Sequence, residues 1–310
     1  MLAAAAACSI EYPSSSRRCL SRLPKSEDEG TLTTSALSPG SGETGDLTVN
    51  NAQWPRLVVS APVALRLPDR LSACLFDLDG VLTRTAVLHA AAWKQVFDEF
   101  LERRTARSSR PFVAFDPVSD YDDYVDGRPR LDGTRAFLRS REIDLPEGAD
   151  DDAPGSETVH GLANRKNTVV LQLLKERGVE VYPGSVRFLD EVGRAGLATA
   201  VVSSSANTTT VLRAAGLEGR FDTSVDGLVA GRLHLAGKPA PDTYLEAARR
   251  LCVQPGDAAV FEDALAGVEA GKAGRFGFVV GVDRVGQARA LTDHGADIVV
   301  TDLAELIDET

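Results

Sequence analysis

Short, continuous apolar runs recur along the chain and predict buried strands. They occupy residues 73–76, 197–202, 221–225, 258–261, 278–282 and 297–300. Between several of these runs, apolar side chains spaced three and four residues apart predict helices at 208–215, 241–251 and 264–273. Alternation of strand and helix is typical of a parallel sheet with helices on both faces. We therefore expect an α/β fold built on a doubly wound parallel sheet.

One long stretch after the first predicted strand has helical patterns but no strong strand signal. Residues 85–102 place His89, Trp93 and Phe97 on one helical face. Further helical patterns occupy 121–125, 134–141 and 163–177. We therefore predict a helical cap domain at 86–178, inserted into a sheet domain that comprises 67–85 and 179–310.

The first 66 residues follow neither pattern. They combine scattered Ser, Thr, Gly and Pro with no sustained period, which predicts a disordered N-terminal extension. The first 25 residues are rich in Arg and Ser and contain one acid, Glu11. This composition leaves organelle targeting open as an alternative to the cytoplasmic location that we expect.

Charge and hydropathy narrow the classes of partner. The 310 residues have a formal net charge of −11, so binding to nucleic acid is disfavoured and an anionic substrate needs a local positive pocket. No apolar run approaches the ~20 residues of a transmembrane helix, so we expect no membrane association. The sequence shows no sign of an obligate protein partner.

Two aspartates follow the first predicted strand directly. Asp77 and Asp79 are separated by one residue, and Gly80 then ends the strand. The carboxyl ends of parallel strands are where ligands bind in such sheets. Two carboxylates this close are costly unless a cation or a shared proton relieves their repulsion. A solvated turn would also explain the pattern, but a metal-dependent pair of acid and nucleophile explains it better.

Three further polar groups stand at the ends of later predicted strands. Ser203 to Ser205 follow one apolar run, Lys238 lies between Gly237 and the prolines that start a helix, and Glu262 and Asp263 follow another run. Each alone could be a helix cap, a surface charge or a partner of a helix dipole. Their joint order along the strand ends favours one shared catalytic site.

This combination resembles the haloacid dehalogenase-like superfamily of phosphotransferases over residues 72–306. Several segments are similar to its β-phosphoglucomutase branch: Phe-Asp-Leu-Asp-Gly-Val-Leu-Thr at 76–83, Arg-Lys-Asn at 165–167, Tyr-Pro-Gly at 182–184 and Lys-Pro-Ala-Pro-Asp at 238–242. The resemblance implies a Rossmann-like core with a cap domain. It also implies phosphoryl transfer on a small phosphorylated sugar.

The roles follow from the chemistry of that transfer. Asp77 is expected to attack phosphorus and form an aspartyl phosphate, while Asp79 protonates the leaving oxygen and deprotonates the next acceptor. A hard cation, best Mg²⁺, is needed to offset the repulsion between carboxylate and phosphate. We expect Asp77 and Asp263 to bind it by side chain and Asp79 by its carbonyl, with Glu262 in an outer layer or acting through water.

Other residues are expected to bind the substrate. Lys238, Ser203 and Ser204 would hold the oxygens of the transferred phosphate. In the resembled family a His and a cap-domain Lys, here His89 and Lys166, couple closure to activation of the acid and base residue. His89 could instead be a polar residue that faces the core.

A second phosphate of the substrate needs its own site. The segment 127–130, Gly-Arg-Pro-Arg, matches a Gly-x-x-Arg element of the family, so Gly127 and Arg130 are candidates, with Ser205 and Asn207 completing the site. A solvated surface role for Arg130 stays open. Two residues depart from the family pattern: Ala206 stands where the better-studied mutases have Lys, and Arg84 replaces a common acid. Whether Arg84 or Arg128 compensates is open.

The β-phosphoglucomutase branch implies interconversion of β-glucose 1-phosphate and glucose 6-phosphate. The alternative is a phosphatase that uses the same residues on a small phosphorylated sugar or polyol and admits water. A halide-removing enzyme is disfavoured, because it needs no leaving-group acid such as Asp79. A non-catalytic binding domain is disfavoured because every chemical position is filled.

Overall fold

The computed structural model describes residues 64–107 and 111–308, so nearly all of the predicted N-terminal extension lies outside the described residues. These residues contain a six-stranded sheet in the order β3-β2-β1-β4-β5-β6, and every pair of neighbours is parallel. The strands are β1 (Ala73–Phe76), β2 (Ala198–Val202), β3 (Thr223–Val225), β4 (Ala258–Glu262), β5 (Phe278–Val282) and β6 (Ile298–Val300). The predicted doubly wound parallel sheet is therefore confirmed.

Strand β1 lies at the centre of the sheet and is buried on both faces, which is why its sequence is apolar throughout. Phe76 aligns with Val201 on β2 and with Phe261 on β4. Its ring stacks on Phe261 at a centroid distance of 4.7 Å and meets Phe188 edge-on at 6.2 Å. Burying such a side chain contributes about 1.5–3 kcal/mol, so this packing fixes the position of the residue that follows, Asp77.

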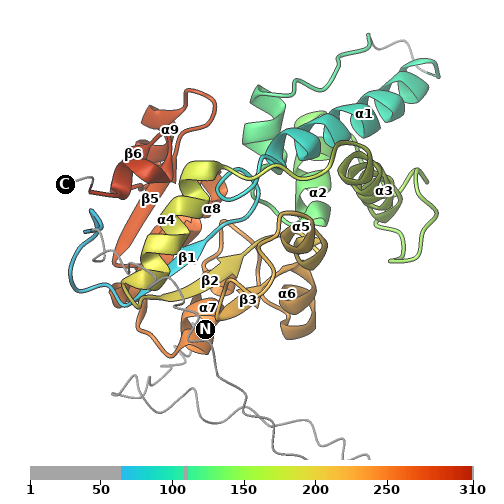
Figure 1. Cartoon of the computed structure of the whole chain (residues 1–310). Helices are drawn as coiled ribbons and strands as arrows, with labels where there is room; N and C mark the ends of the chain where they lie inside the picture. Colours follow the sequence, from blue (N-terminus) through green and yellow to red (C-terminus); the bar gives the residue numbers. More distant parts are fainter. Residues whose placement is uncertain (1–63, 108–110, 309–310) are drawn as a thin grey trace, which may run out of the picture. The chain divides into compact units, whose positions relative to one another are not determined.

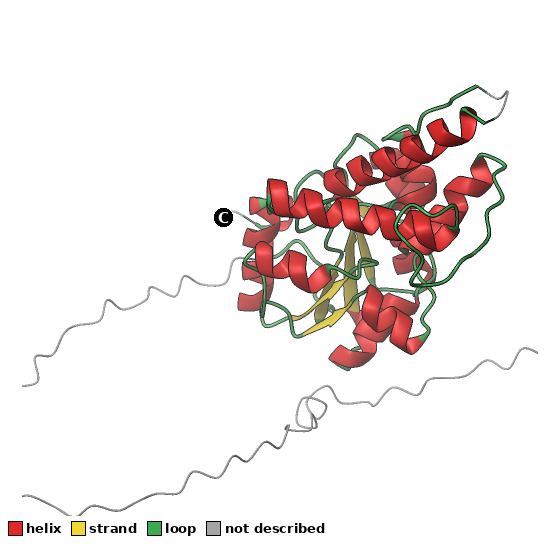
Figure 2. Cartoon of the chain, turned by 90° about the vertical axis from the view of Figure 1, so that its right-hand side faces the viewer, coloured by secondary structure: helices red, strands yellow, loops and turns green. Residues whose placement is uncertain are grey.

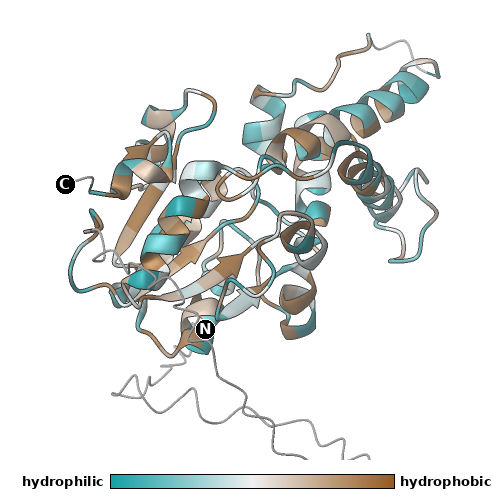
Figure 3. Cartoon of the chain, viewed as in Figure 1, coloured by the Kyte–Doolittle hydropathy of each residue, from teal (hydrophilic) through white to brown (hydrophobic). Residues whose placement is uncertain are grey.

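Helices cover both faces of the sheet (Figures 1 and 2). Helix α4 (Pro183–Arg194) packs on one face through Phe188, and α7 (Asp242–Leu251) and α8 (Leu265–Ala273) pack on the other. Most strand residues are apolar, with β3 (Thr-Ser-Val) an exception, while the helices alternate apolar and polar positions, as Figure 3 shows. The remaining short helices of this part are α5 (Thr208–Ala214), α6 (Gly227–Leu233), α9 (Ala288–Asp293), η2 (Pro255–Asp257) and η3 (Leu303–Leu306).

Between β1 and β2 the chain forms helices in the stretch where the sequence shows helical patterns. This insertion comprises α1 (Ala86–Thr105), the π-helix η1 (Tyr121–Val125), α2 (Arg130–Ser140) and α3 (Val159–Arg177), and α1 to α3 lie together (Figure 1). Its core is aromatic: Phe97 stacks on Trp93 and on Phe137, with ring centroids 4.9 Å and 4.0 Å apart. By its contacts the chain from residue 62 onward forms one compact unit, so the division into core and cap domains stays a prediction.

Two connections join the insertion to the sheet, and they pair with each other. Thr83 and Val181 form an antiparallel bridge, and the Arg84 amide donates to the Glu180 carbonyl at 2.8 Å. The Tyr182 ring lies against the guanidinium groups of Arg84 and Arg284, at 4.5 Å and 3.5 Å from the ring centroid. Within the described residues, no helix combines the length and apolar character needed to cross a bilayer.

Candidate active site

The strand order reverses direction between β1 and β4, because the chain continues from β1 to β2 on one side and adds β4 on the other. In open α/β sheets this switch point opens a crevice at the carboxyl ends of the strands. Asp77 follows β1 there, while Glu262 ends β4 and Asp263 follows it. A cavity of about 400 Å³ lies at this edge, and both Asp77 and Asp263 line it.

Gly80 gives Asp263 the space it occupies. Its φ of +95° is a conformation that side chains disfavour, and a Cβ atom there would lie 1.7 Å from Oδ2 of Asp263. Gly267, at the start of α8, leaves space for Glu262 in the same way, because a Cβ would lie 1.9 Å from that carboxyl group. The three carboxylates of Asp77, Glu262 and Asp263 can therefore place oxygens within 4.8 Å of one another.

Lys238 lies beneath these carboxylates and is almost fully buried. Its Nζ donates to Oδ1 of Asp77 at 2.5 Å, to Glu262, and to the Val202 carbonyl at 3.3 Å. Burial alone would lower the pKa of Lys238, but Asp77 and Glu262 outweigh it and raise that pKa. The lysine is therefore a permanent cation between two acids. Glu262 also accepts hydrogen bonds from the Tyr244 hydroxyl at 2.8 Å and from the Ala264 backbone amide at 3.3 Å.

One lysine does not offset the acidic charge of this edge. Burial, followed by the neighbouring Glu262 and Asp79 carboxylates, raises the pKa of Asp77 well above its usual range. The pKa of Asp263 is also raised well above its usual range, first by burial and then by the Asp126 and Asp77 carboxylates. A divalent cation would relieve this repulsion, and the donor set consists of the carboxylate oxygens that hard cations prefer. The residues present thus fit a divalent metal ion.

Asp79 turns its carboxylate toward the start of the insertion. It accepts a hydrogen bond from the Thr85 hydroxyl, and the Ser203 hydroxyl lies 3.4 Å from its Oδ2. Nε2 of His89 is 3.7 Å from Oδ1 of Asp79. The second acid of the pair therefore contacts the insertion, whereas Asp77 contacts the core lysine.

His89 and Lys166 meet across the insertion, from α1 and α3. Nζ of Lys166 lies 3.0 Å from Nδ1 of His89 and 4.8 Å from the centre of the Trp93 ring. Burial and the nearby lysine lower the pKa of His89 to about 4, and burial lowers the pKa of Lys166 to about 7. While Lys166 is an ammonium group it can only donate, so in that state Nδ1 of His89 accepts and the ring proton is on Nε2, toward Asp79.

The loop after β2 binds the insertion at two points. The Ser204 hydroxyl donates to the Gly127 carbonyl at 2.7 Å, and Nδ2 of Asn207 donates to Oδ1 of Asn167 at 3.0 Å. Within the loop, the Ser205 hydroxyl accepts from the Asn207 amide at 3.1 Å. Ala206 also lines the cavity, but its side chain offers no polar atom.

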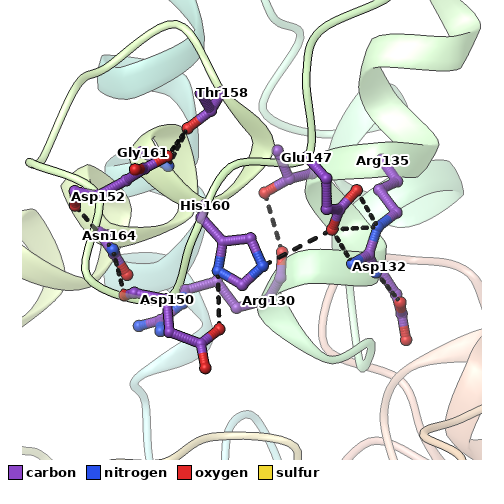
Figure 4. A network of polar contacts seen from close by, with 11 residues as sticks. Arg130, Asp132, Arg135, Glu147, Asp150, Asp152, Thr158, His160, Gly161 and Asn164 are labelled. Atoms are coloured by element: carbon purple, nitrogen blue, oxygen red, sulfur yellow. Dashed lines mark hydrogen bonds and ion pairs between the residues drawn. The ribbon is translucent and has the colours of Figure 1, made fainter.

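Arg130 begins α2 and lines the same cavity. Its Nε is buried and has no hydrogen-bond partner in the described part of the chain, and burial lowers the pKa of this side chain. Arg135, one turn further along α2, is paired instead: it binds Asp132 at 2.7 Å and also Glu147 (Figure 4). His160 lies between Glu147 and Asp150, 3.7 Å and 3.2 Å away, so this network ties the preceding loop to α3.

The structure brings all the predicted site residues to one place. Lys238 and Glu262 form the buried layer under Asp77, and the others line the cavity: Asp77, Asp79, His89, Gly127, Arg130, Lys166, Ser203, Ser204, Ser205, Asn207 and Asp263. Arg84 is not among the lining residues and instead stacks on Tyr182. It therefore does not replace a cation at Ala206.

Two residues next to the carboxylate cluster, Asp126 and Tyr121, were not predicted from the sequence. Asp126 follows η1 and lines the cavity, and burial followed by Glu262 raises its pKa to about 7. Tyr121 hydrogen-bonds to it. The turn at Gly127 brings Asp126 and Tyr121 to the cavity. This turn packs closely on the core, because a Cβ on Gly127 would lie 2.9 Å from the Cβ of Ala264, the residue after Asp263. No local pattern in the sequence signals such a tertiary approach.

Comparison with known proteins places this chain in a family. A model of haloacid dehalogenase-like hydrolases matches residues 71–275. The chain is 55% identical over 246 residues to a β-phosphoglucomutase of Mycobacterium tuberculosis, covering 78% of this chain and 94% of that protein. It is 31% identical to a β-phosphoglucomutase of Bacillus subtilis over 237 residues, 76% of this chain and 92% of that protein.

A solved structure agrees with the sequence relatives. A β-phosphoglucomutase from Clostridium difficile superimposes with a TM-score of 0.60 at 26% identity, covering 77% of this chain and 94% of that one. The shared fold, the matching family model and the sequence identity agree. This chain belongs to the haloacid dehalogenase-like hydrolase family, in its β-phosphoglucomutase-like branch.

Proposed function

We propose that this protein is a Mg²⁺-dependent β-phosphoglucomutase, which interconverts β-glucose 1-phosphate and glucose 6-phosphate through a sugar bisphosphate. The observation that carries the proposal is the 55% identity with a β-phosphoglucomutase over 94% of that protein's length. The site residues, their roles and the cytoplasmic location predicted above belong to the same proposal.

Asp77 is the nucleophile in this proposal. One oxygen of its carboxylate attacks phosphorus, the bond between phosphorus and the donor oxygen breaks, and an aspartyl phosphate forms. Nζ of Lys238 lies 2.5 Å from Oδ1 of Asp77, which places a fixed positive charge beside the oxygens of the transferred group. The Ser203 hydroxyl, at the end of the neighbouring strand, supplies a hydrogen bond to the same group.

Asp77, Asp263 and the Asp79 carbonyl would hold Mg²⁺, with Glu262 supporting them through Lys238 and Tyr244. When bound, this ion supplies positive charge that offsets the repulsion between the attacking carboxylate and the phosphate. The raised pKa values of Asp77 and Asp263 support this assignment, because an acidic cluster that lacks a cation tends to retain protons.

Asp79 is the acid and base. It gives a proton to the sugar oxygen that leaves phosphorus, and later removes a proton from the hydroxyl that attacks the aspartyl phosphate. A hydrolase for an activated leaving group would not need this acid. His89 and Lys166 approach Asp79 from the insertion, which supports the prediction that closure of the insertion on the core activates the acid.

A mutase must also exclude water from the aspartyl phosphate while the sugar bisphosphate reorients in the cavity. Contacts from the insertion to the core support this: Ser204 binds the Gly127 carbonyl, and a Cβ on Gly237 would lie 1.9 Å from Pro129. The insertion therefore meets the core directly beside the cavity. We propose that residues 86–178 act as a cap over the aspartyl phosphate.

Phosphorus NMR of the reaction products tests the proposal. The full chain is mixed with β-glucose 1-phosphate, Mg²⁺ and a trace of β-glucose 1,6-bisphosphate as primer. We expect the signal of glucose 6-phosphate to replace that of the substrate, with little free phosphate. The Asp77→Asn variant, which keeps the size of the side chain, is the control and should give no product.

Two results would contradict the mutase assignment. Release of free phosphate as the main product would identify a phosphatase that uses the same residues. No conversion by a folded protein, verified by its cooperative thermal unfolding, would favour a non-catalytic binding domain.

A further inference from the structure

An arginine outside the cavity holds the turn that carries Asp79. Arg284 lies just after β5, two strands away from β1 in the sheet, and it does not line the cavity (Figure 1). Its side chain is only 13% exposed. Nε donates to the Gly80 carbonyl at 2.8 Å, and Nη2 donates to the Val81 carbonyl at 3.3 Å. A residue from a distant part of the chain therefore binds two successive carbonyls of the turn after β1.

Gly80 is the point at which this turn can change shape most easily. Glycine has no Cβ and moves readily among backbone conformations, and the φ of Gly80, +95°, is one that other residues disfavour. The Gly80 amide donates to the Thr83 carbonyl at 2.7 Å, which fixes the peptide group between Asp79 and Gly80. Arg284 fixes the next peptide group through the Gly80 carbonyl. Both peptide groups that flank Gly80 are thus held, and with them the backbone that carries Asp79.

The guanidinium group of Arg284 is itself held in place. It packs on the Tyr182 ring, 3.5 Å from the centroid, and its Nη1 donates to the Thr301 carbonyl at 2.6 Å. The Asp302 carboxylate lies 3.9 Å away and supplies the opposite charge. Gly184 leaves space for that carboxylate, because a Cβ would lie 1.7 Å from Oδ1 of Asp302. The Tyr-Pro-Gly segment at 182–184 therefore helps to hold Arg284.

The loop that carries Arg284 also contacts the second turn of the site. The Asp283 carboxylate accepts hydrogen bonds from the backbone amides of residues 285–288, which fixes the shape of the loop. Nε2 of Gln287 donates to the Asp263 carbonyl at 3.0 Å. One ordered loop thus binds the turns after β1 and β4, and Arg284 is its contact with the turn of Asp79.

We propose that Arg284 is a positioning residue for Asp79: by binding the Gly80 and Val81 carbonyls, it keeps the Asp79 carboxylate where it gives its proton to the leaving oxygen. This inference rests on the proposed function in taking Asp79 as that acid. It needs no contact between Arg284 and the substrate. A displacement of about 1 Å in a reacting group can cost about a hundredfold in rate, so a remote support of this kind affects the reaction.

Two phosphate esters with different leaving groups separate this role from a merely structural one. Benzyl phosphate releases a basic alkoxide oxygen, as a sugar phosphate does, and its leaving group needs a proton from an acid. p-Nitrophenyl phosphate releases a stable phenolate that does not need one. We would measure kcat/KM for both esters at saturating Mg²⁺. This constant reports phosphoryl transfer to Asp77, whether water or a sugar later consumes the aspartyl phosphate.

Four variants are compared. Arg284→Met keeps the length of the side chain but removes its donors, and Arg284→Lys keeps the positive charge. Asp79→Asn shows the pattern that a missing acid produces. The matched control is Arg289→Met on the neighbouring helix α9, where the arginine side chain is 95% exposed. Cooperative thermal unfolding verifies that each variant is folded.

Arg284→Met should lower kcat/KM about ten- to hundredfold for benzyl phosphate and less than about threefold for p-nitrophenyl phosphate. Asp79→Asn should show the same selectivity with a larger loss, and Arg289→Met should resemble the wild type with both esters. Arg284→Lys should recover part of the loss, because lysine keeps the charge but not the planar arrangement of donors.

Unchanged kcat/KM for benzyl phosphate in Arg284→Met would overturn the inference. Equal losses for the two esters would also overturn it, because a merely structural role gives that result. If Arg284→Met does not fold, Arg284→Lys is judged by the same two criteria. Failure of the proposed function gives a different result, in which Asp79→Asn loses activity equally on both esters. Failure of the inference alone leaves the selective loss in Asp79→Asn intact.

Discussion

Lys166 links the insertion to Asp79, the proposed acid and base, through a single intermediate side chain. Its ammonium group lies 3.0 Å from Nδ1 of His89, and Nε2 of His89 lies 3.7 Å from Asp79. Nε2 is buried and has no hydrogen-bond partner in the part of the chain that the structure describes. A small movement of the insertion would bring it into contact with Asp79. The three residues therefore form a connection that closure of the proposed cap would complete.

This connection predicts a specific pH dependence. Because burial lowers the pKa of Lys166 to about 7, its side chain is a cation below that pH and neutral above it. If the cation aids closure over an anionic substrate, kcat/KM of the wild type falls as the pH rises through 7. Lys166→Arg keeps its charge across this range, so the ratio of wild-type to variant kcat/KM should fall as the pH rises.

Taking that ratio cancels the titration of the substrate phosphate itself, which occurs near pH 6. Steady-state kinetics from about pH 5.5 to 8.5 provide the measurement. A ratio that stays constant across the range would show that the charge of Lys166 has no part in the reaction.

At the residue scale, the sequence predicts those side chains whose position follows from a strand end. Asp77 and Asp263 directly follow apolar runs, and their local pattern is enough to place them at one edge of the sheet. The prediction that Lys238 also stands at a strand end is wrong, because it lies in the loop between α6 and α7 and reaches the edge through that loop. Asp126 and Tyr244 could not be found in this way. They reach the site through a turn and a helix whose packing against the core is decided by contacts far away in the sequence.

At the element scale, the turn that follows β1 is as important as the strand itself. Gly80 combines a φ of +95° with a carboxylate oxygen only 1.7 Å from where a Cβ would lie. The turn thus leaves space for Asp263, which follows a different strand, β4. An added methyl group at this position would have to displace the carboxyl group from the acidic cluster.

Gly80→Ala should therefore weaken Mg²⁺ binding. We expect the Mg²⁺ concentration for half-maximal activity to rise about tenfold or more, because one carboxylate of the cluster is displaced. Gly155→Ala is the matched control: its φ is +91°, but nothing lies within 4 Å of the added Cβ. This control should lose only about 1–2 kcal/mol of unfolding free energy through backbone strain. Equal Mg²⁺ dependence in the two variants would refute this role of Gly80.

The elements predicted from the sequence are those with a clear apolar period. All six strands and the long helices of the insertion were found, although α2 begins four residues before the predicted 134–141. Helices α4, α6 and α9 were missed. Helix α6 has seven residues and contains two glycines, and α9 has six residues. Because α6 and α9 are so short, their helical state depends on tertiary packing more than on propensity. Helix α4 does have an apolar spacing, with Val186, Leu189 and Val192 three residues apart, so the sequence contains the signal that predicts it.

At the scale of the whole molecule, the core and the insertion share one apolar cluster. It includes Phe76 and Phe261 of the sheet, Leu82 in the connection, and Trp93 and Phe97 of α1. The two connections between the insertion and the sheet also form hydrogen bonds with each other, next to Tyr182. If the insertion moves as the cap proposed above, this short paired segment, which lies close to Asp77 and Asp79, would be its hinge. This arrangement suits a site that must admit a sugar phosphate and then exclude water.

The central claim is that Asp77 receives the phosphate, assisted by a divalent cation. Its most direct test is to mix the enzyme with β-glucose 1,6-bisphosphate and Mg²⁺, quench in acid, digest, and locate the phosphoryl group by mass spectrometry. We predict phosphorylation of Asp77, its absence in Asp77→Asn, and its loss in excess EDTA. A phosphoryl group on another residue, or full turnover in EDTA without any labelled aspartate, would contradict the account.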